Sequence, residues 1–323
     1  MGTHLITGGA GFVSVNLTRQ LLARGECVIA VDDLSRGKLA FLDEFEANPH
    51  FHFVKQDCSA AAQLRECVLD FHRKDAIAEA WLLAANSDIP AGVTDPHVDL
   101  SRTFMTTFAT LLVVRELGIP IVHFASSSAV YGDHSDLAVA ENNGPLEPIS
   151  NYGAMKLASE AQIRAAVESY LKRANIFRFP NVVGLPATHG IILDLIRKAC
   201  HSSNGGFDVL GDGTQQKVYL HIADLVEAML YIRDNAKGRY NVYNIGPQDD
   251  GVSVRGIAEA VRDRVALGAE LWFSGGDRGW VGDVPRFRYD TGKLAALGWR
   301  PRMGSSEAIA RAVDEIAREE AGG

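Results

Sequence analysis

The chain has 323 residues, with 32 Lys and Arg against 40 Asp and Glu, a formal net charge of -8 and 47% hydrophobic residues. This length suits one large α/β domain or two smaller ones, and the negative balance without Lys/Arg clusters favours a small-molecule enzyme over a nucleic-acid or membrane binder. Four cysteines without a CxxC pair, and no run of 18 apolar residues, predict a cytoplasmic protein without disulfides, bound metal, export signal or membrane span.

Short apolar or β-branched runs alternate with helix-length amphipathic segments from residue 3 to about residue 180. Such alternation is typical of a parallel sheet covered by helices. The predicted strands are His4–Thr7, Cys27–Val31, His52–Val54, Ala80–Ala84, Ile121–Ala125 and Asn175–Phe179. The predicted helices between them are Phe12–Arg24, Gln63–Phe71, Asp99–Leu117 and Tyr152–Lys172. Gly25 and Gly118 follow helix ends, where a left-handed cap is favoured.

The strict alternation weakens after about residue 180, where Gly, Pro and polar loops become more frequent. Further helices are predicted for Thr188–Cys200, Val252–Val265 and Ser305–Ala321, with Ser253 as an N-cap. We therefore predict that residues 1–180 form a dinucleotide-binding domain. Residues 181–323 would form mainly a smaller substrate lobe, with some segments returning to the first domain.

A glycine-rich string, TGGAGFVS, occupies residues 7–14 between the first predicted strand and the first predicted helix. Gly8 and Gly11 would permit a tight turn and the close approach of a pyrophosphate, whose charge the helix N-terminus meets. Phe12 and Val13 open that helix. This placement predicts a dinucleotide site.

Carboxylates close the next two predicted strands. Asp32 and Asp33 stand where a ribose-binding carboxylate is expected, and Asp32 would repel a 2′-phosphate, which favours NAD over NADP. Arg36 is the counter-signal, because a nearby cation would accept that phosphate; we interpret it as a solvated loop residue. Asp57 and Cys58 end the third strand, where the adenine should lie, although an ordinary turn is nearly as good an interpretation.

Tyr152 and Lys156 stand four residues apart and therefore share one face of a predicted helix. A phenol with a pKa of about 10 is a poor base at neutral pH, so a nearby ammonium and a cationic nicotinamide would be needed to lower that pKa. Upstream, the run SSSAVYG at residues 126–132 offers hydroxyl groups at the carboxyl end of a strand.

With these motifs the chain resembles the extended short-chain dehydrogenase/reductase family, the NAD-dependent nucleotide-sugar epimerases and dehydratases. The matching pieces span nearly the whole length: TGGAGF, LLAAN, SSSAVYG, YGAMK, RFPNVVG, GDGTQQKVYLHIADL, GDVPRFRYD and LGWRP. The resemblance implies a Rossmann-type doubly wound parallel sheet with a smaller C-terminal α/β substrate lobe. It also implies tightly held NAD, a nucleotide-diphosphate sugar as substrate, UDP-sugars being favoured, and a homodimer built on a four-helix bundle.

The resemblance assigns roles to individual residues. Tyr152 matches the family's base, Lys156 its partner on the nicotinamide ribose, and Ser127 the hydroxyl that bonds the reacting oxygen. The implied cofactor contacts are Gly8, Gly11, Phe12, Val13, Asp32, Asp33, Asp57, Cys58, Leu83, Ala84, Ala85, Tyr152 and Lys156. The implied substrate contacts are Asn86, Ser127, Asn181, His189, Lys217 and Arg278. Ser87 and Asp88, beside Asn86, are further candidates.

The choice of reaction depends on the residues just after the catalytic hydroxyl. Dehydratases and decarboxylases of the family resemble one another in placing acidic residues there, whereas this chain has Ser128 and Ala129. The SSSAVYG form resembles the 4-epimerases instead. We therefore predict an isomerase that inverts C4 of the sugar through a transient 4-keto intermediate. The alternatives are a dehydratase or reductase of the same family and, further off, a non-catalytic NAD-sensing protein.

Two points in the C-terminal half concern the contact to the substrate diphosphate and the segment YLHIADL. Many relatives clamp the substrate diphosphate with the Arg of an Arg-x-Gly-Asp step, where this chain has Trp280. The cations near enough in sequence to replace it are Lys217, Arg278, Arg286 and Arg288, and the sequence leaves the choice among them open. In YLHIADL, we expect His221 to be structural and Asp224 to cap the following helix.

Overall fold

The computed structural model describes residues 2–133, 137–202, 205–276 and 288–322. The chain divides into two compact units: unit 1 contains residues 1–132, 145–178 and 229–243, and unit 2 contains residues 133–144, 179–228 and 244–323. Among the helices in the described ranges, none is both long and apolar enough to cross a membrane.

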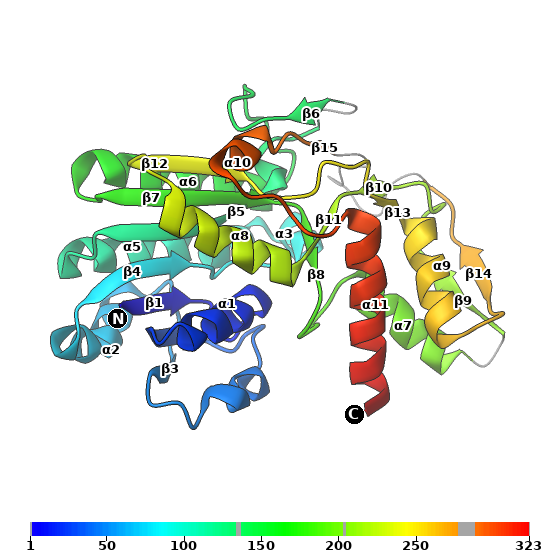
Figure 1. The fold of residues 1–323 in the computed structure, drawn as a ribbon, viewed down its shortest axis with the longest axis horizontal. Helices are drawn as coiled ribbons and strands as arrows, with labels where there is room; N and C mark the ends of the chain where they lie inside the picture. The colour runs from blue at the N-terminus through cyan, green and yellow to red at the C-terminus, as the bar shows by residue number, and fades with distance from the viewer. Residues whose placement is uncertain (1, 134–136, 203–204, 277–287, 323) are drawn as a thin grey trace. The chain divides into compact units, whose positions relative to one another are not determined.

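A seven-stranded sheet forms the centre of unit 1 (Figure 1). Its order is β12-β7-β5-β4-β1-β2-β3, and the pairs β1–β2, β1–β4, β2–β3 and β4–β5 are parallel. The strands are β1 (Thr3–Thr7), β2 (Cys27–Asp32), β3 (Phe51–Lys55), β4 (Ile77–Leu82), β5 (Ile121–Ser127), β7 (Arg173–Phe179) and β12 (Tyr240–Asn244). The strand order reverses between β1 and β4, which is the point where open doubly wound sheets bind ligands. The predicted fold class is confirmed.

Helices pack on both sides of this sheet (Figure 1). They are α1 (Phe12–Ala23), α2 (Ala61–Lys74), α5 (Met105–Leu117), α6 (Asn151–Ser169) and the later part of α8 (Ile222–Asn235). Gly25 and Gly118 have φ values of 75° and 70°, so both take the left-handed conformation predicted after helix ends.

The predicted helix Asp99–Leu117 is helical along its whole length, but it is not one regular α-helix from Asp99 onward. The chain instead forms two short helices, α3 (Ile89–Thr94) and α4 (Pro96–Asp99), then a π-helical segment, η2 (Leu100–Phe104), and then α5. Asp88 and Asp95 cap the two short helices by accepting hydrogen bonds from Ala91 N and His97 N. These caps give the segment separate starts that apolar spacing alone does not show.

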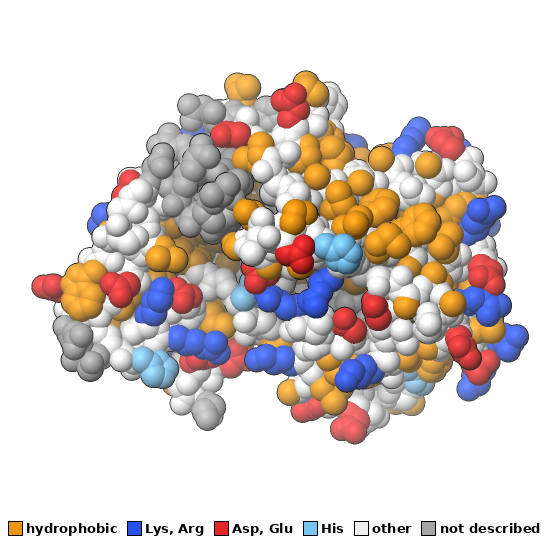
Figure 2. Space-filling model, turned by 180° about the vertical axis from the view of Figure 1, so that it is seen from behind, with side chains coloured by type: hydrophobic (Ala, Val, Ile, Leu, Met, Phe, Trp, Pro, Cys, Tyr) orange, Lys and Arg blue, Asp and Glu red, His pale blue; other side chains and the backbone are white. Residues whose placement is uncertain are grey.

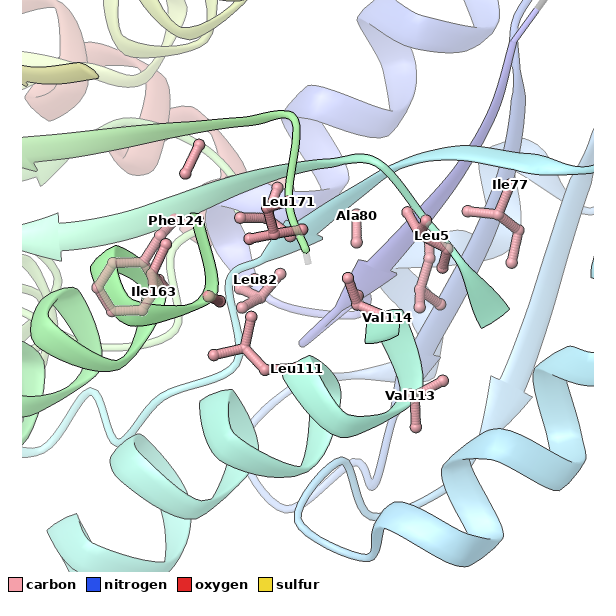
Figure 3. Packing of buried hydrophobic residues seen from close by; sticks show 14 of the residues in the cluster. Leu5, Ile77, Ala80, Leu82, Leu111, Val113, Val114, Phe124, Ile163 and Leu171 are labelled. Carbon is pink, nitrogen blue, oxygen red and sulfur yellow. The ribbon is translucent and has the colours of Figure 1, made fainter. Parts of the chain in front are cut away.

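The main core of unit 1 lies between the sheet and the helices α2, α5 and α6. Leu111 and Val114 of α5 point towards Leu82, Ala80 and Leu5 of the central strands (Figure 3). All five side chains are at most 3% exposed. The central strands are buried almost without interruption, as expected of a parallel sheet covered on both faces.

A polar network is buried against the same sheet, centred on Arg233 of α8. Its guanidinium contacts Glu79 at 2.7 Å and Glu26 at 2.8 and 2.9 Å, and Glu26 also bonds His4. Glu79 in turn contacts Nε2 of the fully buried His123 at 3.0 Å. Burial opposes ionisation, but the His and Arg partners outweigh it and lower the pKa of Glu26 and of Glu79 to about 2.

This network predicts acid-sensitive stability. Burial lowers the pKa of His123 against the opposing effect of Glu79, so the folded state takes up a proton less readily than the unfolded state. The free energy of unfolding should therefore fall as the pH drops below about 6.5, the ordinary His pKa, and fall again below about 4.5 as the unfolded chain protonates Glu26 and Glu79. Urea unfolding at pH 8, 6.5 and 5 measures the first decline. The variant His123→Gln should show a smaller decline, whereas a control at the exposed His50, His50→Gln, should leave it unchanged; an equal decline in all three proteins would contradict the assignment.

Unit 2 is built mainly from three helices, α7 (Ile191–His201), α9 (Val254–Val265) and α11 (Ser305–Gly322), which share one apolar core. Its short strands are β6 (Ala138–Val139), β8 (Asn181–Val183), β9 (Gly206–Val209), β10 (Gln216–Lys217), β11 (Tyr219–His221), β13 (Val252–Ser253), β14 (Glu270–Phe273) and β15 (Arg288–Tyr289), with α10 (Gly292–Leu297) before α11. Ser253 caps α9 as predicted by accepting from Gly256 N.

Asp224 corrects one prediction in this unit. It lies inside the first turn of α8 instead of capping it. Its carboxylate accepts hydrogen bonds from the backbone of Arg302 and Met303, both at 3.1 Å, so it ties a distant loop to the helix. His221 bonds Glu315 of α11 at 3.1 Å, as expected for a structural residue.

Candidate active site

The glycine-rich string forms a turn between β1 and α1. Gly8 has a φ of 72°, and a Cβ there would lie 2.8 Å from the backbone of Ala84, so only glycine fits. Gly11 is the N-cap of α1 and, as a glycine, offers no side-chain cap to the first N–H groups of the helix. Phe12 and Val13, the first residues of the helix, are half-buried. The turn thus presents backbone N–H groups and a positive helix end, the arrangement that binds a pyrophosphate.

Asp32 supports this turn from the end of β2. It is 7% exposed, and its carboxylate accepts hydrogen bonds from Ala10 N at 3.1 Å and Leu34 N at 2.7 Å. Burial raises its pKa, although both backbone bonds oppose that rise. The neighbouring Asp33 is exposed and accepts from Ser35 N at 2.8 Å.

The remaining predicted cofactor contacts directly follow the strands β4 and β3. Leu83, Ala84 and Ala85 follow β4 and are half-buried beside the glycine turn. Asp57 is exposed and bonds the backbone and hydroxyl of Ser59. Cys58 is buried, with its thiol 3.6 Å from the carbonyl of Val31, and burial raises the pKa of that thiol to about 12. The thiol is therefore protonated and unreactive at neutral pH.

The structure brings Ser127, Tyr152 and Lys156 together at the carboxyl end of β5. Ser127 ends the strand, and its hydroxyl lies near enough to the phenol of Tyr152, in the first turn of α6, to favour the ionised form of that phenol. Lys156, one turn later, is 2% exposed; its Nζ donates to the carbonyl of Ala125 at 2.5 Å and lies 5.6 Å from the centre of the Tyr152 ring. Ser150 starts the helix by accepting from Gly153 N, which sets the rotation that aims both side chains at the strand end.

Burial dominates the titration of this pair. It raises the pKa of Tyr152 to about 12, and the nearby Ser127 hydroxyl opposes that rise. It lowers the pKa of Lys156 to about 7, although Glu160 and Asp99 both favour the charged form. The depression of the phenol pKa expected from Lys156 is therefore outweighed in the protein without cofactor.

A buried ion pair fixes the elements that carry these side chains. Glu160 and Arg178, each 4% exposed, contact one another at 2.6 and 2.9 Å. Glu160 also accepts from the Ser126 hydroxyl, and Arg178 contacts the Tyr131 hydroxyl at 3.0 Å. The pair thus ties α6 and β7 to the residues on both sides of Ser127. The Ser126 hydroxyl is therefore engaged by the buried ion pair.

Asn86 is turned away from solvent, which corrects its assignment as a substrate contact. It is 3% exposed, and its amide nitrogen donates to Asp99 Oδ1 at 2.9 Å and to the carbonyl of Asp88 at 2.7 Å. Its backbone N–H donates to Thr103 at 3.1 Å. These bonds hold the loop after β4 on the helices below it, so the Asn86 side chain has no group left for a ligand.

Unit 2 contains the other predicted substrate contacts. Asn181 and His189 are exposed, and His189 Nδ1 contacts the Thr188 hydroxyl at 2.7 Å. Lys217 is half-buried on β10. Arg288 forms an ion pair with Asp250 at 2.6 Å. Arg278, Trp280 and Arg286 lie outside the described residues.

Comparisons with known proteins agree with this geometry. The model of the "NAD dependent epimerase/dehydratase family" matches residues 4–246. The chain belongs to the NAD-dependent epimerase/dehydratase family. It is 29% identical to the UDP-glucose 4-epimerase of Mycolicibacterium smegmatis over 96% of this chain and 97% of that one. It superposes on a crystal structure of a UDP-galactose 4-epimerase with a TM-score of 0.84 and 31% identity, covering 98% of this chain and 99% of that one. It also superposes on a dTDP-glucose 4,6-dehydratase of Streptomyces venezuelae with NAD bound. The TM-score is 0.85 and the sequence identity is 26%, covering 99% of this chain and 98% of that one.

Membership of the epimerase/dehydratase family makes NAD the cofactor, and the residues present fit it. Gly8 keeps the turn tight against the backbone of Ala84, the N-terminus of α1 has no side-chain cap from Gly11, and Asp32 stands at the end of β2. Gly8, Gly11 and the first turn of α1 would hold the pyrophosphate, and Lys156 would hold the nicotinamide ribose.

Sequence reasoning missed several residues that support this family's site. Glu160 and Arg178 lie far apart in the chain, and only the folded structure shows that they pair. Two signals were available: Glu160 is four residues after Lys156 and so shares its helix face, and Arg178 is a charge inside an otherwise apolar strand. A charge in such a strand requires a buried partner.

Proposed function

We propose that the chain is an isomerase that inverts C4 of a nucleotide-diphosphate sugar through a transient 4-keto sugar. When bound, NAD supplies the hydride acceptor for the oxidation and a positive charge beside the phenol. The residues of the chain manage the proton. Tyr152 accepts it from the C4 hydroxyl and returns it after the sugar has turned over, and Ser127, whose hydroxyl lies near the phenol, holds the reacting oxygen in place.

Lys156 would act through its charge. Its pKa of about 7 keeps a large part of it protonated near neutral pH, and its buried position next to the Tyr152 ring leaves little water to screen that charge. Together with the cofactor charge, the ammonium favours the phenolate over the phenol. Asp99 and Glu160, which favour the charged ammonium, are held inside the protein by Asn86 and Arg178.

The absence of a carboxylate after Ser127 carries the choice of epimerase over dehydratase. Elimination of water from C5 and C6 needs an acid and a base beyond Tyr152. Ser128 and Ala129 follow Ser127 in the turn η3 (Ser128–Val130), where Ala129 N donates to Ser127 Oγ at 3.2 Å. The two carboxyl groups that act on Lys156 are both buried: Glu160 is paired with Arg178, and Asp99 accepts from Asn86 through Oδ1. The relatives include both epimerases and dehydratases, so the site residues carry this proposal.

The proposed substrate is a UDP-sugar, because the similar epimerases are a UDP-glucose 4-epimerase and a UDP-galactose 4-epimerase. Lys217 and Arg278 remain the proposed contacts for its diphosphate. The ion pair of Arg288 with Asp250 makes Arg288 a weaker choice, because a diphosphate would have to displace that carboxylate.

We further propose that two copies associate through α5 and α6. Figure 2 shows hydrophobic side chains gathered on the side of unit 1 where these helices lie. Leu100, Leu112 and Ile149 on or beside these helices are between 43% and 45% exposed, and Phe104 and Phe108 stack with ring centres 6.3 Å apart. Sedimentation velocity of the purified chain tests this proposal: a monomer at micromolar concentration would contradict it.

The reaction is tested by incubating the purified protein with UDP-glucose, UDP-galactose, their N-acetylated forms and dTDP-glucose, without added cofactor. The expected result is interconversion of one pair of C4 epimers with no net change in absorbance at 340 nm. A stable 4-keto product would establish the dehydratase alternative. Stoichiometric consumption of added reduced cofactor would establish a reductase.

A further inference from the structure

Arg36 lies in the loop that leaves β2 and returns to the glycine turn. At Leu34 the backbone takes a φ of 62°, which reverses the chain after Asp32. Gly37 then packs so closely on the turn that a Cβ there would lie 2.8 Å from Ala10 Cβ. Arg36 is thus held between Asp32, which marks the adenosine ribose, and the turn that faces the pyrophosphate. A guanidinium at this place is within reach of a phosphate on the ribose.

The structure shows where that guanidinium is engaged. Arg36 Nη1 contacts Asp88 Oδ2 at 3.3 Å. Asp88 belongs to the loop after β4, and β4 and β2 are the two neighbours of β1 in the sheet. The ion pair therefore joins the loops on either side of β1, at the carboxyl edge where the glycine turn lies.

Asp88 holds this position firmly because its other oxygen has a structural role. Oδ1 accepts from Ala91 N at 3.1 Å and caps α3, and its backbone N–H donates to Asn86 Oδ1 at 3.0 Å. The carboxylate is thus oriented independently of Arg36. The other cation of the loop, Lys38, lies 5.6 Å from the centre of the Phe41 ring.

We propose that Asp88 makes the cofactor site selective for NAD over NADP by engaging Arg36. A 2′-phosphate would have to take Arg36 from Asp88 and would then stand beside three carboxylates, those of Asp32, Asp33 and Asp88. Asp32, already bonded to two backbone N–H groups, cannot move away. The exposed Arg36–Asp88 pair contributes little to stability, so its role is to occupy the guanidinium and fix its direction.

The test uses Asp88→Asn in the full-length protein. Asn caps helices as well as Asp does, so α3 should remain intact; Asp88→Ser, another good cap, serves as a second variant. Each protein is first exchanged against isotopically labelled NAD until native mass spectrometry shows complete replacement. It is then equilibrated with NAD and NADP at a series of ratios. The bound fractions give the ratio of the two dissociation constants.

The expected result is a shift of this ratio towards NADP by roughly fivefold to tenfold, because a freed guanidinium can bond the 2′-phosphate. Adding Arg36→Ala should abolish the shift, which separates the action through Arg36 from direct repulsion by Asp88. Asp95→Asn, a change to another exposed capping carboxylate on the same segment, should leave the ratio unchanged. An unchanged ratio in Asp88→Asn, or the same shift with Arg36 removed, would overturn the proposal. The readout is dinucleotide binding, so it holds whichever sugar reaction the enzyme performs.

Discussion

Replacing Tyr152 by Phe should lower kcat by roughly 10²- to 10⁴-fold, the usual contribution of a positioned acid–base group. The change removes the hydroxyl proposed to accept the proton and leaves the ring that packs near Lys156. The protein should fold normally, with KM changed much less than kcat. Initial rates of C4 epimer formation, with the melting temperature of the same preparation, measure this effect.

Tyr170→Phe is the matched control. Tyr170 directly follows α6, and its hydroxyl bonds the carbonyl of Leu111 at 3.1 Å, away from Ser127. Its loss should cost about 1 kcal/mol of stability and leave kcat within about twofold, because this hydroxyl takes no part in the proposed proton transfer. If Tyr152→Phe instead kept the rate of the natural protein, Tyr152 would not be the base.

Replacing Arg178 by Met should destabilise the protein by about 3–5 kcal/mol, the usual cost of leaving a buried charge without its partner. Of its hydrogen-bond partners Arg178 and Ser126, the Glu160 carboxylate would keep only the Ser126 hydroxyl. It would remain buried, where water does not reach it. Because the pair joins α6 and β7 next to Ser127, activity should fall as well. Urea unfolding of the two proteins at pH 7.5 measures the difference.

Two further variants separate this effect from the loss of any arginine. Arg73→Met breaks an exposed pair with Asp70 and should cost less than about 1 kcal/mol. The double variant Arg178→Met/Glu160→Leu removes both charges and should recover a large part of the lost stability. A loss in Arg178→Met no greater than in Arg73→Met would show that the buried pair does not hold the site together.

The sheet and the catalytic set were predictable because their signals are local. A buried parallel strand is a short apolar run, and the six predicted strands are all present. The fourth strand begins at Ile77, three residues before the predicted start at Ala80. The prediction began too late because Glu79 interrupts the apolar pattern, and the Arg233 that compensates its charge is 154 residues away in sequence. Ser127, Tyr152 and Lys156 could likewise be placed from the ends of one strand and the face of one helix.

Features that depend on distant partners could not be predicted. The strand β12 returns to unit 1 only after α8, and nothing near Tyr240 in the sequence shows which sheet it joins. The Asn86 amide was predicted to contact the substrate because the sequence does not show its partner, Asp99. Asp99 lies in the short helix α4, which the apolar spacing does not separate from α5. Arg36 was interpreted as solvated, and only the folded loops show that Asp88 reaches it.

The most direct test of the proposed chemistry follows a deuterium atom on C4 of the sugar. The purified enzyme is given the UDP-hexose that it converts, or dTDP-glucose if it converts no UDP-sugar, labelled with deuterium at C4, and the product is examined by NMR. An epimerase returns the same hydrogen to the opposite face, so the account predicts that the label stays on C4 with inverted configuration. Label transferred to C6 of a 4-keto-6-deoxy sugar would show a dehydratase, and would contradict the role assigned here to Ser127, Ser128 and Ala129.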